Sequence, residues 1–165
     1  MSAKSEPQAL VHPIPPLFDA QSRVLILGSF PSVKSREAKF FYGHPQNRFW
    51  RVLAALTGSP LPATIEEKKR LILENHFALW DSIASCTITG SSDSSIRDVV
   101  PNDLRAITEH APIERIFCNG NTSLKYYRRY NEPLLGRPAV VLPSTSPANA
   151  AWSLQRLAEA WRVIL

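Results

Sequence analysis

Four short apolar runs in this chain each end in a stretch of small polar residues. These stretches are Gly28-Ser-Phe-Pro-Ser32, Trp80-Asp-Ser82, Cys118-Asn-Gly-Asn121 and Pro143-Ser-Thr-Ser-Pro147. They offer hydroxyls, amides and free backbone N–H groups, which together can bind an oxyanion. Neither G-x-G-x-x-G nor G-x-x-x-x-G-K-[ST] occurs, so the binding of a dinucleotide or a nucleoside triphosphate lacks its usual motif.

A fifth segment gathers more chemistry than its length suggests. His44-Pro-Gln-Asn-Arg-Phe-Trp50 holds an imidazole, two amides, a cation and two aromatic rings. A purely structural interpretation also fits, in which Asn47 caps a helix and Phe49 and Trp50 enter the core. The residue types of this segment alone do not decide between the catalytic and the structural interpretation.

The other polar stretches have structural alternatives as well. Asp81 follows a buried tryptophan at the carboxyl end of a predicted strand, a position typical of a site residue, but a helix-capping or ion-paired acid fits too. Gly28–Ser32 could be an ordinary turn, and Ser144–Pro147 could be a proline turn rather than a seat for a phosphate. Three histidines are expected at surface or capping positions: His12, His76 and His110.

The basic charge is concentrated beside these stretches. The net charge is +5, from 19 Lys and Arg against 14 Asp and Glu. Residues 23–51 carry six basic groups and one acid, and residues 119–165 carry a net +4, whereas residues 52–118 carry a net −3. A cationic patch around a site favours a polyanion such as nucleic acid, although a basic surface can also serve solubility alone.

Composition excludes several other classes. Two cysteines, Cys86 and Cys118, make neither a disulfide framework nor a zinc or iron–sulfur ligand set. No apolar run approaches the ~20 residues of a membrane span. The first 16 residues lack the layout of a secretion signal. We therefore expect a cytoplasmic protein that is not secreted, binds no membrane and uses no metal.

The pattern predicts an α/β fold that brings the polar stretches together. Residues 1–22 are expected to form an extended arm, and residues 23–165 a single domain. The predicted strands are 23–28, 77–80, 115–118 and 138–142; the predicted helices are 48–56, 64–75, 101–110, 121–130 and 151–163; residues 29–46 and 81–100 are predicted loops. Strands alternating with helices indicate a three-layer αβα sandwich around a short four-stranded, mostly parallel sheet. Ligands bind beyond the carboxyl ends of such strands, where the polar stretches lie.

Taken together, these motifs resemble the uracil-DNA glycosylase superfamily, and most closely its hypoxanthine branch, the DNA-deoxyinosine glycosylases. The resemblance covers about residues 22–163. It is carried by Gly28–Ser32, Phe41-Tyr-Gly-His-Pro-Gln-Asn-Arg-Phe-Trp50, Leu79-Trp-Asp81, Gly90-Ser-Ser-Asp-Ser-Ser-Ile96 and Ser144–Pro147. The chain also departs from the superfamily's best-known pattern at three positions.

Each departure changes what the resemblance implies. Phe30 stands where many members have an acid or amide that activates water, so the catalytic amide carries over to Asn47 of the His-Pro-x-Asn motif, as in the hypoxanthine branch. Ser144 stands where a base-contacting histidine is usual. Ala148 stands where a bulky residue wedges into DNA, which leaves the wedge unassigned.

The resemblance implies a monofunctional base-excision repair glycosylase. It would flip a deaminated base, hypoxanthine first and also uracil or xanthine, and hydrolyse its N-glycosidic bond without cofactor or metal. The expected partner is double-stranded DNA, with single-stranded DNA left open, bound by a monomer in the cytoplasm of a cell of bacterial or archaeal type.

The resemblance also assigns residues to roles. The catalytic candidates are Asn47, Ser29 and His44. The base-binding candidates are Phe30, Tyr42, Asp81, Asn119 and Ser144. The candidates for DNA phosphate contacts are Pro31, Ser32, Ser144, Ser146 and Pro147. Asn47 could orient water or donate to the departing base, and the sequence leaves both open. Asp81 stands where relatives read the base edge, and an ionised acid would accept from an N–H and repel the lone pair of adenine or cytosine.

Three alternatives remain at this point. One is a uracil or G·U mismatch glycosylase of the same fold. Another is a nucleic-acid-binding domain without catalysis. The third is an unrelated α/β hydrolase acting on small esters, although Gly28–Ser32 lacks the G-x-S-x-G elbow of that class.

Overall fold

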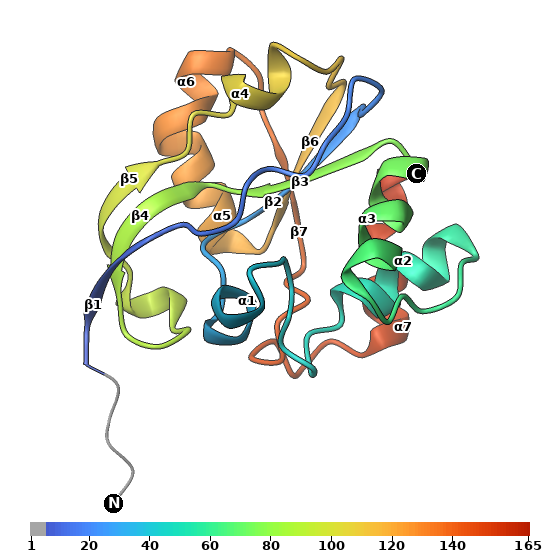
Figure 1. The fold of residues 1–165 in the computed structure, drawn as a ribbon, viewed down its shortest axis with the longest axis horizontal. Helices are drawn as coiled ribbons and strands as arrows, with labels where there is room; N and C mark the ends of the chain where they lie inside the picture. The colour runs from blue at the N-terminus through green and yellow to red at the C-terminus, as the bar shows by residue number, and fades with distance from the viewer. Residues whose placement is uncertain (1–5) are drawn as a thin grey trace, which may run out of the picture.

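A four-stranded parallel sheet lies at the centre of the computed structural model, which describes residues 6–165 (Figure 1). Its order is β3-β2-β6-β7. The strands are β2 (Val24–Gly28), β3 (Phe77–Asp81), β6 (Arg115–Asn119) and β7 (Val140–Leu142). All three strand pairs are parallel, and the register sets Gly28 beside Asp81. The four predicted strands are confirmed, and their carboxyl ends meet at one edge.

Helices cover both faces of this sheet, so the predicted three-layer architecture is confirmed (Figure 1). One face is covered by α2 (Phe49–Thr57), α3 (Ile65–Glu74) and α7 (Leu154–Trp161). The other is covered by α4 (Arg105–Thr108), α5 (Asn121–Tyr126), a π-helical turn (Tyr127–Asn131) and α6 (Glu132–Leu135). Strand β2 is buried along its whole length because alternate side chains enter each layer: Ile26 the first, and Leu25 and Leu27 the second.

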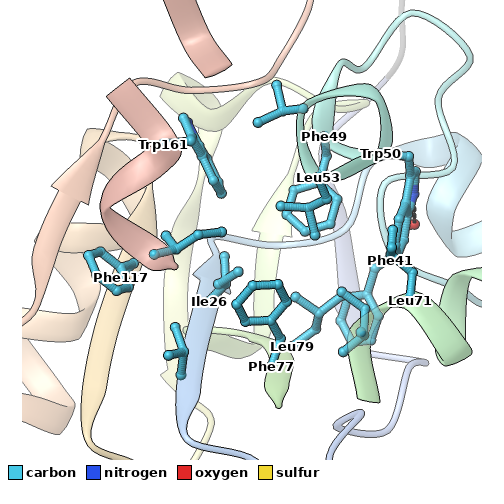
Figure 2. Packing of buried hydrophobic residues seen from close by; sticks show 14 of the residues in the cluster. Ile26, Phe41, Phe49, Trp50, Leu53, Leu71, Phe77, Leu79, Phe117 and Trp161 are labelled. Atoms are coloured by element: carbon cyan, nitrogen blue, oxygen red, sulfur yellow. Dashed lines mark hydrogen bonds between the residues drawn. The ribbon is translucent and has the colours of Figure 1, made fainter. Parts of the chain in front are cut away.

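The larger core joins the sheet to α2, α3 and α7 (Figure 2). Ile26, Leu79 and Phe117 rise from three neighbouring strands, and Phe49 and Trp161 close over them from the helices. The rings of Phe49 and Trp161 pack edge to face, with centroids 5.8 Å apart. The Trp161 indole N–H also donates to the Pro143 carbonyl at 2.9 Å, which ties this core to the loop after β7.

A second, three-stranded antiparallel sheet corrects the prediction of a loop over residues 81–100. Its order is β1-β4-β5, formed by β1 (Gln8–Val11), β4 (Ile83–Ile88) and β5 (Arg97–Pro101). The pairing of β4 with β5 shifts register twice, so Ile83 and Cys86 are both buried at a spacing of three residues. This irregularity breaks the alternation by which a strand is recognised in sequence. Strand β1 also lies within the segment predicted as an extended arm.

The helix boundaries differ from the predictions in the loops. Residues 29–46 contain a helix, α1 (Val33–Ala38), whose N-cap Ser32 accepts from the Ser35 N–H at 3.2 Å. The helix predicted over 101–110 is only the short α4. Short 3-10 turns occupy Asp93–Ser95 and Arg162–Ile164. Among residues 6–165, no helix has the length and apolar character that crossing a bilayer requires.

Trp161 should be the most sensitive core position at the C-terminal end. Its side chain is fully buried, so Trp161→Ala should lower the free energy of unfolding by about 3–5 kcal/mol through lost burial and a cavity. Val163→Ala, two residues away and half exposed, should change it by less than about 0.5 kcal/mol. Urea unfolding of both variants measures the difference, and equal losses would contradict the packing described.

Candidate functional site

One cleft of about 990 Å³ opens beyond the carboxyl ends of the parallel strands. Its walls come from the loop after β2, the end of β3, the start of α5 and the loop after β7. Every site residue predicted from the sequence lines it: Ser29, Phe30, Pro31, Ser32, Tyr42, His44, Asn47, Asp81, Asn119, Ser144, Ser146 and Pro147. The parallel register therefore brings together segments more than a hundred residues apart.

Gly28 forms a floor on which two polar groups converge. A Cβ built on Gly28 would collide with Asp81 Oδ1 and lie 3.2 Å from the Tyr42 hydroxyl. Position 28 therefore needs glycine, although its backbone is an ordinary strand. The missing side chain leaves the Asp81 oxygen and the Tyr42 hydroxyl facing the same small space.

The Tyr42 hydroxyl is buried and finds no hydrogen-bond partner among the described residues. The ring stacks on Phe49, with centroids 3.9 Å apart, and the backbone of Tyr42 has a φ of 52°. Burial, followed by the nearby Asp81 charge, raises the pKa of this hydroxyl, so it stays protonated and can donate. A buried donor without an acceptor is costly, and a bound ligand could supply the acceptor.

Asp81 is held from two directions. His12 Nε2 lies 2.7 Å from Asp81 Oδ2, and the two side chains are only 3% and 6% exposed. Asn102 Nδ2 donates to the Asp81 carbonyl oxygen at 2.9 Å. The expectation of a surface or capping position for His12 did not include this contact, in which its side chain is buried against Asp81. The sequence offered little signal for this contact, because His12 sits in a proline-rich segment without periodicity.

Asn47 lies one residue before Arg48, the N-cap of α2, so the predicted helix cap at Asn47 is displaced by one residue. Its Oδ1 accepts from the Phe49 N–H at 2.9 Å at the start of α2, and the residue also lines the cleft. A backbone N–H can only donate, so the atom that meets it is the oxygen. The Asn47 amide NH₂ then makes no hydrogen bond with any residue in the described part of the chain.

A second carboxylate, Asp93, borders the cleft and was not predicted as a site residue. The Ser29 hydroxyl donates to Asp93 Oδ1 at 3.0 Å. Asp93 is an exposed residue at the edge of the cleft. Burial raises its pKa, and the Asp81 charge adds to that rise, while hydrogen bonds from Ser29 and Thr122 oppose it. The resemblance had marked the Gly90–Ile96 segment without giving any of its residues a role.

The loop after β7 is fixed by its own hydrogen bonds. Both amide atoms of Asn119 engage Thr145: Nδ2 donates to the Thr145 hydroxyl at 2.9 Å, and Oδ1 accepts from the Thr145 N–H at 3.0 Å. The Ser144 and Ser146 hydroxyls accept backbone N–H groups two residues further on, at 3.1 and 3.2 Å. Gly120 approaches Ser144 closely with a φ of 92°, which a side chain would not tolerate.

Arg48 binds backbone carbonyls of this loop and is not part of an exposed basic patch. Its guanidinium donates to the carbonyls of Trp152, Ser146 and Asn149, the last two at 3.0 Å. Arg36 likewise donates to the carbonyls of Pro31 and Gly90, at 3.2 and 3.1 Å. The described lining of the cleft contains no Lys or Arg. Two cations of the basic segment 23–51 thus hold the loops that form the walls.

The remaining predicted residues sit at the walls. Phe30 is only 7% exposed and packs against Ile83 and Cys86 of β4, with the Arg36 guanidinium 5.8 Å from its ring centroid. His44 Nδ1 accepts from the Gln46 N–H at 3.1 Å. Over residues 6–165, no three His, Cys, Asp or Glu side chains gather as metal ligands would.

Comparison with known proteins gives consistent matches over nearly the whole chain. A family model described as the uracil DNA glycosylase superfamily matches residues 15–165. A hypoxanthine DNA glycosylase of Methanosarcina acetivorans is 37% identical over 155 residues, covering 91% of this chain and 94% of that protein. A hypoxanthine DNA glycosylase of Methanosarcina barkeri is 32% identical over 140 residues, covering 82% and 85%.

A solved structure agrees with these matches. The solution structure of a Methanosarcina acetivorans protein, described as a candidate uracil DNA glycosylase, superposes with a TM-score of 0.76 at 31% sequence identity. The alignment covers 92% of this chain and 96% of that one.

Replacing Arg48 should loosen the loop after β7. Arg48→Lys substitutes a point charge for a planar fork, which cannot reach three carbonyls at once. The amides of Asn149 and Trp152, which close turns in this loop, should exchange their hydrogens at least about tenfold faster. The matched control is Arg51→Lys, because Arg51 donates only to the exposed Pro45 carbonyl. Similar exchange in the two variants would refute the role given to Arg48.

Proposed function

The chain belongs to the uracil DNA glycosylase superfamily, and on that premise we propose that it is a DNA glycosylase that excises deaminated bases, hypoxanthine foremost. The single observation that carries the choice of base is the pair of groups above Gly28. Asp81 Oδ1 is an acceptor, and the unpartnered Tyr42 hydroxyl is a donor. The two relatives named as hypoxanthine DNA glycosylases support the same choice.

This pair matches the change that deamination makes to a base. Deamination replaces an amine beside a ring nitrogen lone pair with a carbonyl beside a ring N–H. Hypoxanthine therefore offers N1–H to Asp81 and O6 to Tyr42. Adenine offers the reverse pattern, so its N1 lone pair would face the carboxylate and the Tyr42 hydroxyl would face an amine. Leaving such buried groups unpaired gives strong rejection.

We propose that the cleft promotes cleavage of the N-glycosidic bond by stabilising the departing base. The bond between sugar C1′ and base N9 breaks and its electron pair passes to the base. Water forms the new bond from oxygen to C1′ and loses one proton, which ends on the departed base. The free NH₂ of Asn47 can donate to the base as negative charge grows on it. Because its Oδ1 already accepts from the Phe49 N–H, the donor role is favoured over the positioning of water. Ser29 and His44 line the same cleft and are proposed to hold the water.

The grip on DNA is proposed to come from the loop after β7. The Ser144 and Ser146 oxygens accept backbone N–H groups, so their own hydrogens remain to donate to phosphates. Ser32 donates to the Ser35 hydroxyl within α1, which makes it a weaker candidate. Pro31 and Pro147 shape the two loops. The net charge of +5 adds an attraction that depends on salt. We propose duplex DNA as substrate and a monomer as the active form.

The function is tested by incubating the protein with duplexes that carry one deoxyinosine, deoxyuridine, deoxyxanthosine or normal deoxyadenosine. Alkali should cleave the deoxyinosine strand first, after excision of the base, and the deoxyadenosine strand should stay intact. An unbroken abasic strand before alkali identifies a monofunctional enzyme. Binding without excision of any base would instead support a non-catalytic domain, and faster excision of uracil would support a uracil specialist.

Two substitutions of Asn47 separate its possible roles. Asn47→Asp keeps an oxygen that can accept from the Phe49 N–H, but it removes the NH₂ donor. We expect both Asn47→Asp and Asn47→Ala to lower the single-turnover excision rate by about 10²–10³-fold. The dissociation constant for DNA should change little. If Asn47→Asp retains a rate near that of the wild type, the residue activates water instead.

Tyr42→Phe should separate stability from activity. The hydroxyl has no partner in the free protein, so its loss should leave the free energy of unfolding equal or slightly higher. Excision of hypoxanthine should fall by about tenfold, the value of one hydrogen bond to the base. Thermal unfolding and single-turnover kinetics on the same variant check both halves. Unchanged excision would remove Tyr42 from base recognition.

A further inference from the structure

We infer that His12 is a positioning residue for base selection: it fixes Asp81 so that one carboxylate oxygen remains as an acceptor for the base. This inference rests on the proposed function. His12 does not line the cleft, and it acts through Asp81. Because His12 directly follows β1, residues 8–17 support the site from behind.

The segment from His12 to Leu17 is hydrogen-bonded to both sheets behind the site. The His12 N–H donates to the Ala84 carbonyl of β4 at 2.7 Å. Leu17 pairs with Leu79 of β3 through hydrogen bonds of 2.9 Å in both directions. Figure 1 shows this blue segment running from β1 along β4 toward β3. His12 is thereby delivered to Asp81 by backbone contacts with both sheets.

The hydrogen bonds of His12 decide which nitrogen carries the proton. The Ile14 N–H donates to His12 Nδ1 at 3.1 Å, so Nδ1 presents a lone pair. The hydrogen of the neutral ring is then on Nε2, which donates to Asp81 Oδ2 at 2.7 Å. The ring orientation is fixed by edge-to-face packing against Phe30 and Trp80, with centroids 5.9 and 6.4 Å away.

This arrangement leaves Asp81 with one free oxygen, which faces the cleft as a hydrogen-bond acceptor. Oδ2 is occupied by His12, while Oδ1 faces the space above Gly28. Without His12, nothing in the described structure holds Asp81 Oδ2, so the carboxylate can rotate and turn Oδ1 away from the space above Gly28. A rotated Asp81 would neither accept from the hypoxanthine N1–H nor oppose the N1 lone pair of adenine, and the distinction between the two bases would weaken. His12 therefore keeps the site an acceptor, and selectivity follows from that.

The test is a double-mutant cycle between His12 and Asp81, read as single-turnover excision of hypoxanthine. His12→Phe keeps a buried ring but removes the donor. It should slow excision by about 10- to 100-fold, with little change in the dissociation constant for DNA. In the Asp81→Ala background, where no side-chain acceptor remains for His12, the same substitution should change the rate by less than about twofold. Equal factors in both backgrounds would show that His12 acts independently of Asp81 and would overturn the inference.

Two further variants separate positioning from a structural role. His12→Gln places an amide donor near the position of the imidazole Nε2 and should restore the rate to within about fivefold of the wild type. Ile14→Ala weakens the same segment in the core without touching the pair, so it should lower stability but preserve the preference for hypoxanthine over adenine. A loss of preference in Ile14→Ala equal to that in His12→Phe would contradict the inference.

If His12→Phe fails to fold, the inference can still be tested on the wild-type protein. Nitrogen NMR of the wild-type imidazole should then show a protonated Nε2 and an unprotonated Nδ1, and a hydrogen on Nδ1 would overturn the inference. Failure of the proposed function is separate, because a wild type that excises no deaminated base refutes the glycosylase activity itself. If the wild type is active but the effects of the His12 and Asp81 substitutions on the excision rate are additive, only the role of His12 is refuted.

Discussion

The organisation of the cleft depends on one buried carboxylate. Asp81 ends β3 beside Gly28 of β2, and a charge in that position is tolerated only with partners. His12 supplies one partner, and the absence of a side chain at Gly28 leaves room for the other oxygen to face the cleft. Strands β2 and β3, the segment that carries His12 and the side chain of Tyr42 all meet at this point. A base edge with an N–H beside a carbonyl would complete the hydrogen bonding that the protein leaves unfinished.

The walls of the cleft are held by donors that contact backbone carbonyls rather than DNA. Arg36 joins the loop after β2 to the Gly90 loop, and Arg48 gathers the loop after β7. Asn119 anchors Thr145 in the same loop with both of its amide atoms. Such contacts fix the direction of the Ser144 and Ser146 hydroxyls before any substrate arrives. Phosphate recognition in this account is therefore preorganised by side chains that do not touch the substrate.

The sequence predicted the four parallel strands and the polar turns that line the cleft, because apolar runs ending in polar turns locate the carboxyl ends of strands. Tyr42, His44 and Asn47 were added by the family resemblance, not by this pattern. It could not predict the second sheet, since the register shifts in β4 hide its alternation. It also missed His12, whose partner lies 69 residues away, and Asp93, which reaches Ser29 across 64 residues. Such contacts follow from the assembled fold. The departure at Phe30 did signal that the catalytic polar groups would come from other segments.

A crystal structure of the protein bound to a duplex with a non-hydrolysable deoxyinosine analogue tests the central claim most directly. The account predicts a flipped hypoxanthine with N1 about 2.7–3.0 Å from Asp81 Oδ1 and O6 about 2.6–3.0 Å from the Tyr42 hydroxyl. His12 should still occupy Asp81 Oδ2. A base that leaves both oxygens beyond hydrogen-bond distance, or that turns another edge toward Asp81, would contradict the account.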